Sequence, residues 1–140
     1  DAYFARFRGV RDYQKEAVRR AKALGYAETL FHRRRYLPEL KSGNFNLRAF
    51  GERVARNMPI QGAAADIIKI AMNRIHREFA ARGIHSKVIL QVHDELVIDM
   101  LREEQEEVTA LVREAMEHAA RLRVELVVEC GVGENWLEAH

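Results

Sequence analysis

A change of hydrophobic period near residue 87 limits the possible folds of this chain more than any other feature. From Ile60 to Arg82, apolar residues recur every three or four positions, which is typical of a helix. From Lys87 to Asp99, the period falls to two, with a single interruption at His93-Asp94. Two short strands that meet at a two-residue tip form a β-hairpin. The sequence therefore predicts a helix followed by an antiparallel hairpin.

The alternation also predicts which side chains share a face of each strand. In the first strand, Val88, Leu90 and Val92 are expected on one face, opposite Ile89, Gln91 and His93. In the second strand, Leu96 and Ile98 are expected on the face opposite Glu95, Val97 and Asp99. Each strand therefore has one face suited to packing against helices.

The remaining elements follow from the same spacing rules. Helices are predicted over residues 3–24, 47–57, 60–82 and 103–121, with extended structure over 28–38, a loop over 41–46 and a last strand over 124–130. Pro59 suits the first turn of a new helix and disfavours helical geometry at Met58, so the second and third helices are expected to be separate. Together the elements predict an α+β fold with helices on one face of an antiparallel sheet.

Three local features refine this outline. Gly25 lies where a helix C-cap is expected. Asn44 or Asn46 can cap the helix that begins near Leu47. Near the C-terminal end, Trp136 follows two glycines and is expected to pack back on the fold.

Composition excludes several classes of protein. Apolar residues make up 48% of the 140 residues and charged residues 31%, which excludes disorder and collagen and allows a packed core. No apolar run approaches the roughly 18 residues of a membrane span. The single cysteine, Cys130, excludes an internal disulfide and a cysteine-based zinc site, and it favours a reducing compartment.

Charge is distributed unevenly between the two parts of the chain. Residues 1–57 contain 14 Lys and Arg against 6 Asp and Glu, a net charge of +8, whereas residues 58–140 contain 9 against 15, a net charge of −6. A basic part of this kind points to a polyanionic partner, and a solvated basic helix is the alternative. Within it, Arg33, Arg34 and Arg35 stand between Phe31 and Tyr36, a pattern suited to contacts with a phosphate backbone.

The hairpin tip is the first candidate site. No glycine relieves the His93-Asp94 turn, and a turn that ignores the usual residue preferences is often kept for its side chains. Asp94 and Glu95 place two carboxylates at the end of a rigid ribbon, and hard cations such as Mg²⁺ prefer oxygen ligands. A solvated acidic turn is the alternative. No second His or Cys at metal-binding spacing supports zinc at His93.

A second candidate site surrounds Pro59. Arg53 and Asn57 lie one helical turn apart, and Gln61 opens the following helix. Arginine and the amide side chains are those that read bases and sugars, and ordinary surface polarity is the alternative. The small residues that follow, Gly62 to Ala65, allow close approach of another backbone or a nucleic-acid strand, and close packing of two helices is the alternative.

Four ordered motifs resemble family A DNA polymerases over nearly the whole chain. Residues 57–66 are similar to the palm helix of that family, and residues 91–97, Gln-Val-His-Asp-Glu-Leu-Val, to its last catalytic motif. Residues 25–38 resemble a segment of its fingers subdomain, and residues 129–136 also fit.

The resemblance implies a role for each candidate residue. Asp94 would be one of two aspartates that hold the catalytic Mg²⁺ ions, Glu95 would assist it, and His93 would lie near the primer terminus. Arg53, Asn57 and Gln61 would contact the primer–template DNA, and Arg33, Arg34 and Arg35 its backbone.

The resemblance also implies an organisation. Residues 1–57 would be the C-terminal part of the fingers, and residues 58–140 the C-terminal part of the palm. The partner aspartate, the triphosphate-binding helix and the thumb have no match here, so the chain would be a C-terminal fragment, inactive alone, of a polymerase that joins deoxynucleoside triphosphates to a primer in the bacterial cytoplasm, beside the nucleoid.

Two other functions compete with this one. The first is a non-enzymatic DNA-binding module that retains the same fold. The second is a metal phosphohydrolase with a His-Asp pair, which the strand-like flanks of His93-Asp94 disfavour because that pair belongs on a helix.

Overall fold

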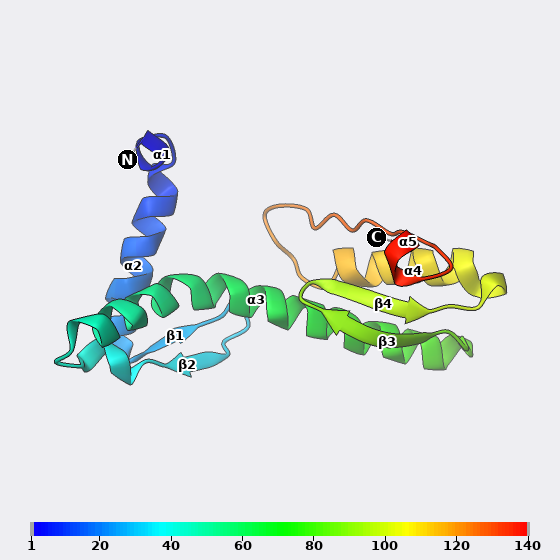
Figure 1. The fold of residues 1–140 in the computed structure, drawn as a ribbon, viewed down its shortest axis with the longest axis horizontal. Coiled ribbons are helices and arrows are strands. Elements are labelled where there is room, and N and C mark those ends of the chain that lie inside the picture. Colours follow the sequence, from blue (N-terminus) through cyan, green and yellow to red (C-terminus); the bar gives the residue numbers. More distant parts are fainter. Residues whose placement is uncertain (1, 140) are drawn as a thin grey trace. The chain divides into compact units, whose positions relative to one another are not determined.

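The computed structural model describes residues 2–139, which form helices and two small antiparallel sheets, so the α+β prediction is confirmed (Figure 1). The chain divides into two compact units, residues 1–64 and 65–140. The elements are, in chain order, α1 (Ala2–Arg6), α2 (Arg8–Leu24), β1 (Tyr26–Glu28), β2 (Arg34–Tyr36), η1 (Pro38–Lys41), α3 (Phe45–Arg82), β3 (Lys87–Val92), β4 (Glu95–Asp99), η2 (Arg102–Glu104), α4 (Gln105–Glu117) and α5 (Trp136–Ala139).

The first unit is built around a short hairpin and a small core. Strands β1 and β2 are antiparallel, with Tyr26 opposite Tyr36 and Glu28 opposite Arg34. The core joins α2, β1, η1 and the start of α3 through Ala21, Ala27, Leu37, Leu40, Ala55 and Met58. Of the predicted extended stretch over 28–38, only Glu28 and residues 34–36 lie in strands, because residues 29–33 form the turn and Pro38 begins η1.

The predicted first helix is interrupted at Phe7. Its backbone angles, φ −113° and ψ 64°, are not helical, and Phe7 separates α1 from α2. Gly9 lies within α2. At the other end, Gly25 adopts a left-handed conformation with φ 79° and donates its N–H to the carbonyl of Ala21, which confirms the predicted C-cap.

The predicted break at Pro59 is wrong. Helix α3 runs through it from Phe45 to Arg82, 38 residues without interruption. A proline inside a helix costs about 3 kcal/mol. That cost is outweighed because the helix buries apolar side chains both before and after Pro59: Ala55, Met58, Ile68, Ala71, Ile75 and Phe79. Each of the four larger side chains contributes about 1.5–3 kcal/mol.

Helix α3 begins at one of the two predicted caps. The side-chain oxygen of Asn44 accepts hydrogen bonds from the backbone N–H groups of Asn46, at 2.8 Å, and Leu47, at 3.4 Å. An asparagine at this position satisfies N–H groups that have no partner within the helix.

The second unit places the β3–β4 hairpin against two helices. Its core combines Ile75 and Phe79 of α3 with Val108, Leu111, Val112 and Ala115 of α4. Val88 of β3 and Leu96 and Ile98 of β4 pack against this core, as their alternation predicts. The hairpin therefore has one face that packs on the core, and the two residues of its turn are exposed.

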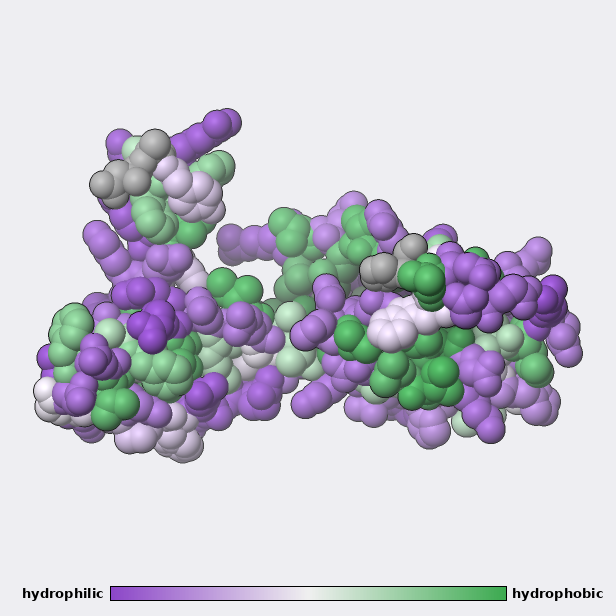
Figure 2. Space-filling view, in the orientation of Figure 1, coloured by the Kyte–Doolittle hydropathy of each residue, from purple (hydrophilic) through white to green (hydrophobic). Residues whose placement is uncertain are grey.

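A β-bulge corrects the predicted face of Leu90. Val88 pairs with Ile98 and Leu90 with Val97, so Ile89 has no partner of its own in the register. An extra residue reverses the alternation beyond it. Leu90 is therefore 44% exposed and lies outside the core. Figure 2 shows hydrophobic side chains on the surface around β3 and β4.

The predicted last strand does not form. Residues 125–130 have no regular secondary structure, and Val124 and Val127 are well exposed. β-branched residues form a strand only where a neighbouring edge pairs with them. Within residues 2–139, β3 and β4 pair only with each other.

Helix α4 covers residues 105–117 of the predicted 103–121. Just before it, Glu104 ties the chain to the residues that precede β3. Its carboxylate accepts hydrogen bonds from the backbone N–H groups of His85, at 2.9 Å, and Ser86, at 2.8 Å, and from the Ser86 hydroxyl, at 2.6 Å. These donors lower the pKa of the Glu104 carboxyl from 4.5 to about 2.

This carboxylate makes stability depend on pH in a defined window. Since the pKa is lower in the folded chain, the stabilisation is complete above pH 4.5 and is lost as the pH falls toward about 2. We expect Glu104→Gln to lower the melting temperature by several degrees at pH 7 and to flatten its dependence on pH within that window. Thermal unfolding measured by circular dichroism checks this. Glu103→Gln, an exposed neighbour, is the control, and equal pH profiles for the two variants would contradict the assignment.

No helix within residues 2–139 is long and apolar enough to cross a membrane.

Candidate functional site

The β3–β4 turn consists of two residues, as predicted. Val92 is paired with Glu95, and only His93 and Asp94 connect them. His93 has a positive φ of 52°, which is uncommon for a residue with a side chain and costs roughly 1 kcal/mol or more. The side chain of Gln91 donates a hydrogen bond of 2.8 Å to the His93 carbonyl and helps to hold this conformation.

The two carboxylates at the turn have different surroundings. Asp94 is exposed, and its side chain makes no hydrogen bond or ion pair with residues 2–139. Glu95 is half-buried, and its Oε1 accepts a hydrogen bond of 2.6 Å from the indole nitrogen of Trp136. The Asp94 carboxylate is therefore exposed to solvent, whereas the neighbouring Glu95 carboxylate is held by Trp136.

The set of oxygen ligands at this turn is incomplete. Within residues 2–139, no group of three or more His, Cys, Asp or Glu side chains could hold a metal ion. Mg²⁺ usually takes one or two protein carboxylates and completes its shell with water and phosphate oxygens. Asp94 fits that role, because its carboxylate is exposed and is not engaged by residues 2–139.

Helix α3 aligns the second group of candidates. Arg53, Asn57 and Gln61 are all exposed, and they follow one another at four-residue intervals on this one helix. Residues at this spacing share a helix face. Because α3 continues through Pro59, Gln61 lies on the same helix as Arg53 and Asn57. The Arg53 guanidinium lies 5.9 Å from the centre of the Phe50 ring.

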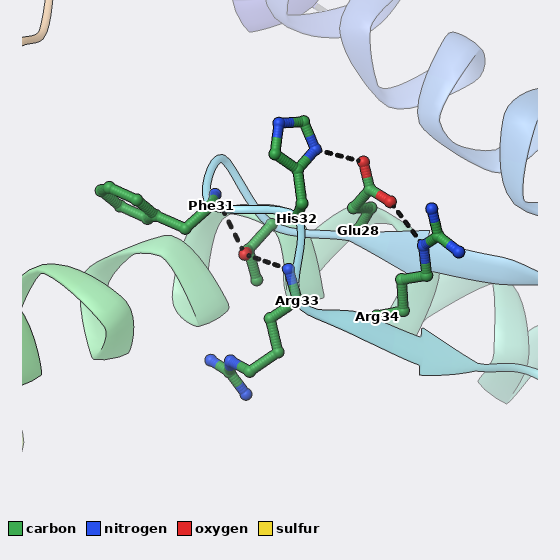
Figure 3. A network of polar contacts seen from close by, with 6 residues as sticks. Glu28, Phe31, His32, Arg33 and Arg34 are labelled. Atoms are coloured by element: carbon green, nitrogen blue, oxygen red, sulfur yellow. Dashed lines mark hydrogen bonds and ion pairs between the residues drawn. The ribbon is translucent and has the colours of Figure 1, made fainter.

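The β1–β2 hairpin gives the three consecutive arginines different surroundings. Nε of Arg34 lies 2.8 Å from Glu28 Oε2 (Figure 3). The Arg34 guanidinium lies 4.7 Å from the centre of the Tyr26 ring. Nδ1 of His32 lies 2.8 Å from the other oxygen of Glu28. The hydrogen bonds from His32 and Arg34 hold the pKa of the Glu28 carboxyl below its usual value. The guanidinium of Arg34 is therefore partly occupied by contacts within the β1–β2 hairpin.

Arg33 connects the hairpin turn to α3. Its Nη2 donates a hydrogen bond of 3.0 Å to the carbonyl of Gly62. Its backbone N–H and that of Phe31 donate to the hydroxyl of buried Thr29 (Figure 3). Arg35, in contrast, is exposed and has no side-chain partner among residues 2–139. Of the three, Arg35 is the best placed to meet a phosphate.

The close approach at Gly62 has a cause that sequence reasoning missed. A Cβ atom on Gly62 would lie only 2.6 Å from Cγ2 of Thr29. The small residue therefore admits the β1–β2 turn, which among the described residues is the other backbone segment that approaches this position. No local sequence pattern indicated a contact between positions 29 and 62.

The predicted site residues thus lie on three elements, in two units. His93, Asp94 and Glu95 are joined at the β3–β4 turn, in the second unit. Arg53, Asn57 and Gln61 share a face of α3, and Arg33 to Arg35 lie on the β1–β2 hairpin, all in the first unit. Sequence reasoning expected Trp136 to pack back, and this is confirmed, but its partner Glu95 was not foreseen, because 41 residues separate the two.

Comparison with known proteins gives consistent matches. The family model described as DNA polymerase family A matches residues 1–138. DNA polymerase I of Streptococcus pneumoniae serotype 4 is 49% identical over 139 residues, which are 99% of this chain and 16% of that protein. DNA polymerase I of Mycobacterium bovis is 51% identical over 136 residues, or 97% of this chain and 15% of that protein. The chain therefore spans about one sixth of the length of these curated relatives.

A solved structure has the same fold. It is the POL domain of Pol1 from M. smegmatis in complex with a DNA primer-template and dNTP. The match has a TM-score of 0.96 and 49% sequence identity, and it covers 98% of this chain and 24% of the other.

Proposed function

This chain belongs to DNA polymerase family A, and we propose that it is part of a template-directed DNA polymerase that adds deoxynucleotides to a primer 3′ end by two-metal nucleotidyl transfer. The observation that carries the proposal is the β3–β4 turn, where an exposed Asp94 carboxylate with no partner among residues 2–139 stands beside a Glu95 carboxylate held by Trp136.

In this proposal Asp94 holds the catalytic Mg²⁺, and Glu95 assists from the adjacent position. The ions would supply positive charge beside the attacking and leaving oxygens. Because Asp94 alone cannot complete such a site, the second carboxylate would come from a part of the polymerase outside these residues. The 140 residues alone are therefore expected to be inactive.

The exposed arginines and amide side chains of the first unit support DNA as the second partner. Arg53, Asn57 and Gln61 present one guanidinium and two amides on the exposed face of α3, a combination suited to sugars and base edges. We assign these three residues and His93 to the primer–template, and Arg33, Arg34 and Arg35 to its backbone. Arg35 is expected to contribute most of the three, because Arg33 and Arg34 already have partners within the first unit.

The proposed organisation follows the family. Residues 1–57 would belong to the fingers and residues 58–140 to the palm, with deoxynucleoside triphosphates as substrates of the complete polymerase. A protein of this kind would act on the nucleoid, in the bacterial cytoplasm.

Primer extension by the full-length polymerase tests the proposal. We expect addition of the template-complementary nucleotide, dependent on added Mg²⁺, and no extension by the 140 residues alone. The isolated chain is expected to bind duplex DNA with an affinity that falls at least tenfold between roughly 50 and 200 mM salt, as phosphate contacts require. Failure of the full-length protein to extend any primer would contradict the proposal. If it still bound DNA with this salt dependence, the non-enzymatic module would be the better description.

A further inference from the structure

The C-terminal helix α5 reaches back to the residue that follows Asp94. Nε1 of Trp136 donates a hydrogen bond of 2.6 Å to Oε1 of Glu95, within the second unit. Glu95 is the first residue of β4 and is paired with Val92 across the turn. The indole therefore contacts the base of the turn that carries Asp94.

The chain around Trp136 is arranged to hold it there. Asn135 immediately precedes α5: its side-chain oxygen accepts from the N–H of Glu138 at 3.2 Å, and its amide donates to the Glu138 carboxylate at 2.6 Å. One residue earlier, Glu134 forms an ion pair with Arg102 of η2. The two bonds of Asn135 thus shape the short helix, and the ion pair connects the residue before it to η2.

Two glycines permit this arrangement. A Cβ atom on Gly131 would lie 1.7 Å from the carbonyl oxygen of Ala139, and one on Gly133 would lie 2.6 Å from Cβ of Glu138. The chain therefore passes α5 at a distance that only glycine allows. Larger residues at these two positions would displace the short helix that carries Trp136.

We infer that Trp136 is a positioning residue, which orients the Glu95 carboxylate beside the turn that carries Asp94. This inference rests on the proposed polymerase function. An indole N–H is a donor only, so it fixes the Glu95 oxygen as an acceptor in one orientation. A carboxylate held in this way loses no further side-chain freedom when substrate arrives, and preorganisation of this kind favours the chemical step.

The test compares Trp136→Phe with the wild-type full-length polymerase. Phenylalanine keeps an aromatic ring and removes the N–H donor. We expect kcat for single-nucleotide addition to fall about tenfold, as for the loss of one hydrogen bond to a charged group, with little change in KM for the nucleotide. Leu137→Ala, a well-exposed neighbour on α5, is the matched control and should leave kcat unchanged. All assays are run below the temperature at which any variant begins to unfold.

A double-mutant cycle separates positioning from a structural role. If Trp136 acts through Glu95, then Trp136→Phe should have no further effect on kcat in a Glu95→Ala background. Independent, multiplicative losses, or an unchanged kcat in Trp136→Phe alone, would overturn the inference. If the wild-type protein extends no primer, the proposed function itself fails, which is a distinct result.

A measurement without catalysis examines the contact directly. Selective ¹⁵N labelling of tryptophan gives an indole N–H signal for Trp136, identified by its absence in Trp136→Phe. We expect this proton to exchange slowly with water in the wild type and faster in Glu95→Ala. Equal exchange rates in the two proteins would overturn the inference.

Discussion

Asp94→Asn is expected to lower the rate of primer extension by the full-length polymerase by about three orders of magnitude. Asparagine is nearly isosteric but lacks the charge that a divalent cation requires, and a loss of about 4 kcal/mol of transition-state stabilisation corresponds to that factor. The fold should be unaffected, because Asp94 is exposed and makes no side-chain hydrogen bond or ion pair with residues 2–139. Single-turnover nucleotide addition at saturating substrate measures the effect.

Asp99→Asn is the matched control for this prediction. Asp99 is the last residue of β4 and is exposed. Its substitution removes the same charge at the opposite end of the same hairpin. It should reduce the rate by no more than a small factor. If both variants were equally impaired, net charge would explain the loss. A normal rate for Asp94→Asn would refute the assignment of Asp94 to the metal site.

Ile75→Ala is expected to produce the largest loss of stability. Ile75 is fully buried at the centre of the second core, between α3 and α4. Truncation of a buried isoleucine removes transfer free energy and leaves a cavity, which together cost about 2–5 kcal/mol. Urea denaturation of the 140-residue chain, followed by the fluorescence of Trp136 in the second unit, gives the change in the free energy of unfolding.

Ile70→Ala provides the comparison for this measurement. Ile70 lies on the same helix, but it is 36% exposed and is not part of the core. Its truncation should cost well under half as much. Equal losses for the two variants would show that helix propensity, not core packing, determines the effect.

The hairpin could be predicted because its signal is local. Alternation from Lys87 to Asp99 places the turn at His93-Asp94 without knowledge of any other element. The bulge at Ile89 could not be predicted, because no residue type marks it. It became visible only through the pairing of Leu90 with Val97.

The two larger errors share a physical cause. At Pro59 a local penalty was outweighed by burial along the rest of α3, and at residues 124–130 a local preference for strand found no edge to pair with. In both cases tertiary contacts decided the outcome. These contacts join residues far apart in the sequence, so spacing rules do not detect them.

The candidate site shows the same division. The residue types and the spacing of Asp94, Glu95 and His93 sufficed to single out the turn. The bond between Trp136 and Glu95, and the contact of Gly62 with Thr29, depend on how distant segments fold together. Sequence reasoning therefore proposed residues for the chemistry from local patterns and missed the contacts between distant segments.

The proposed function depends on the Asp94 carboxylate as a ligand of the catalytic metal. A crystal structure of the full-length polymerase with primer–template, an incoming nucleotide and Mg²⁺ tests it most directly. We predict a carboxylate oxygen of Asp94 about 2.1 Å from a Mg²⁺ ion that also contacts the nucleotide phosphates. A structure in which both metal ions are bound and Asp94 remains more than about 4 Å from either would contradict the account.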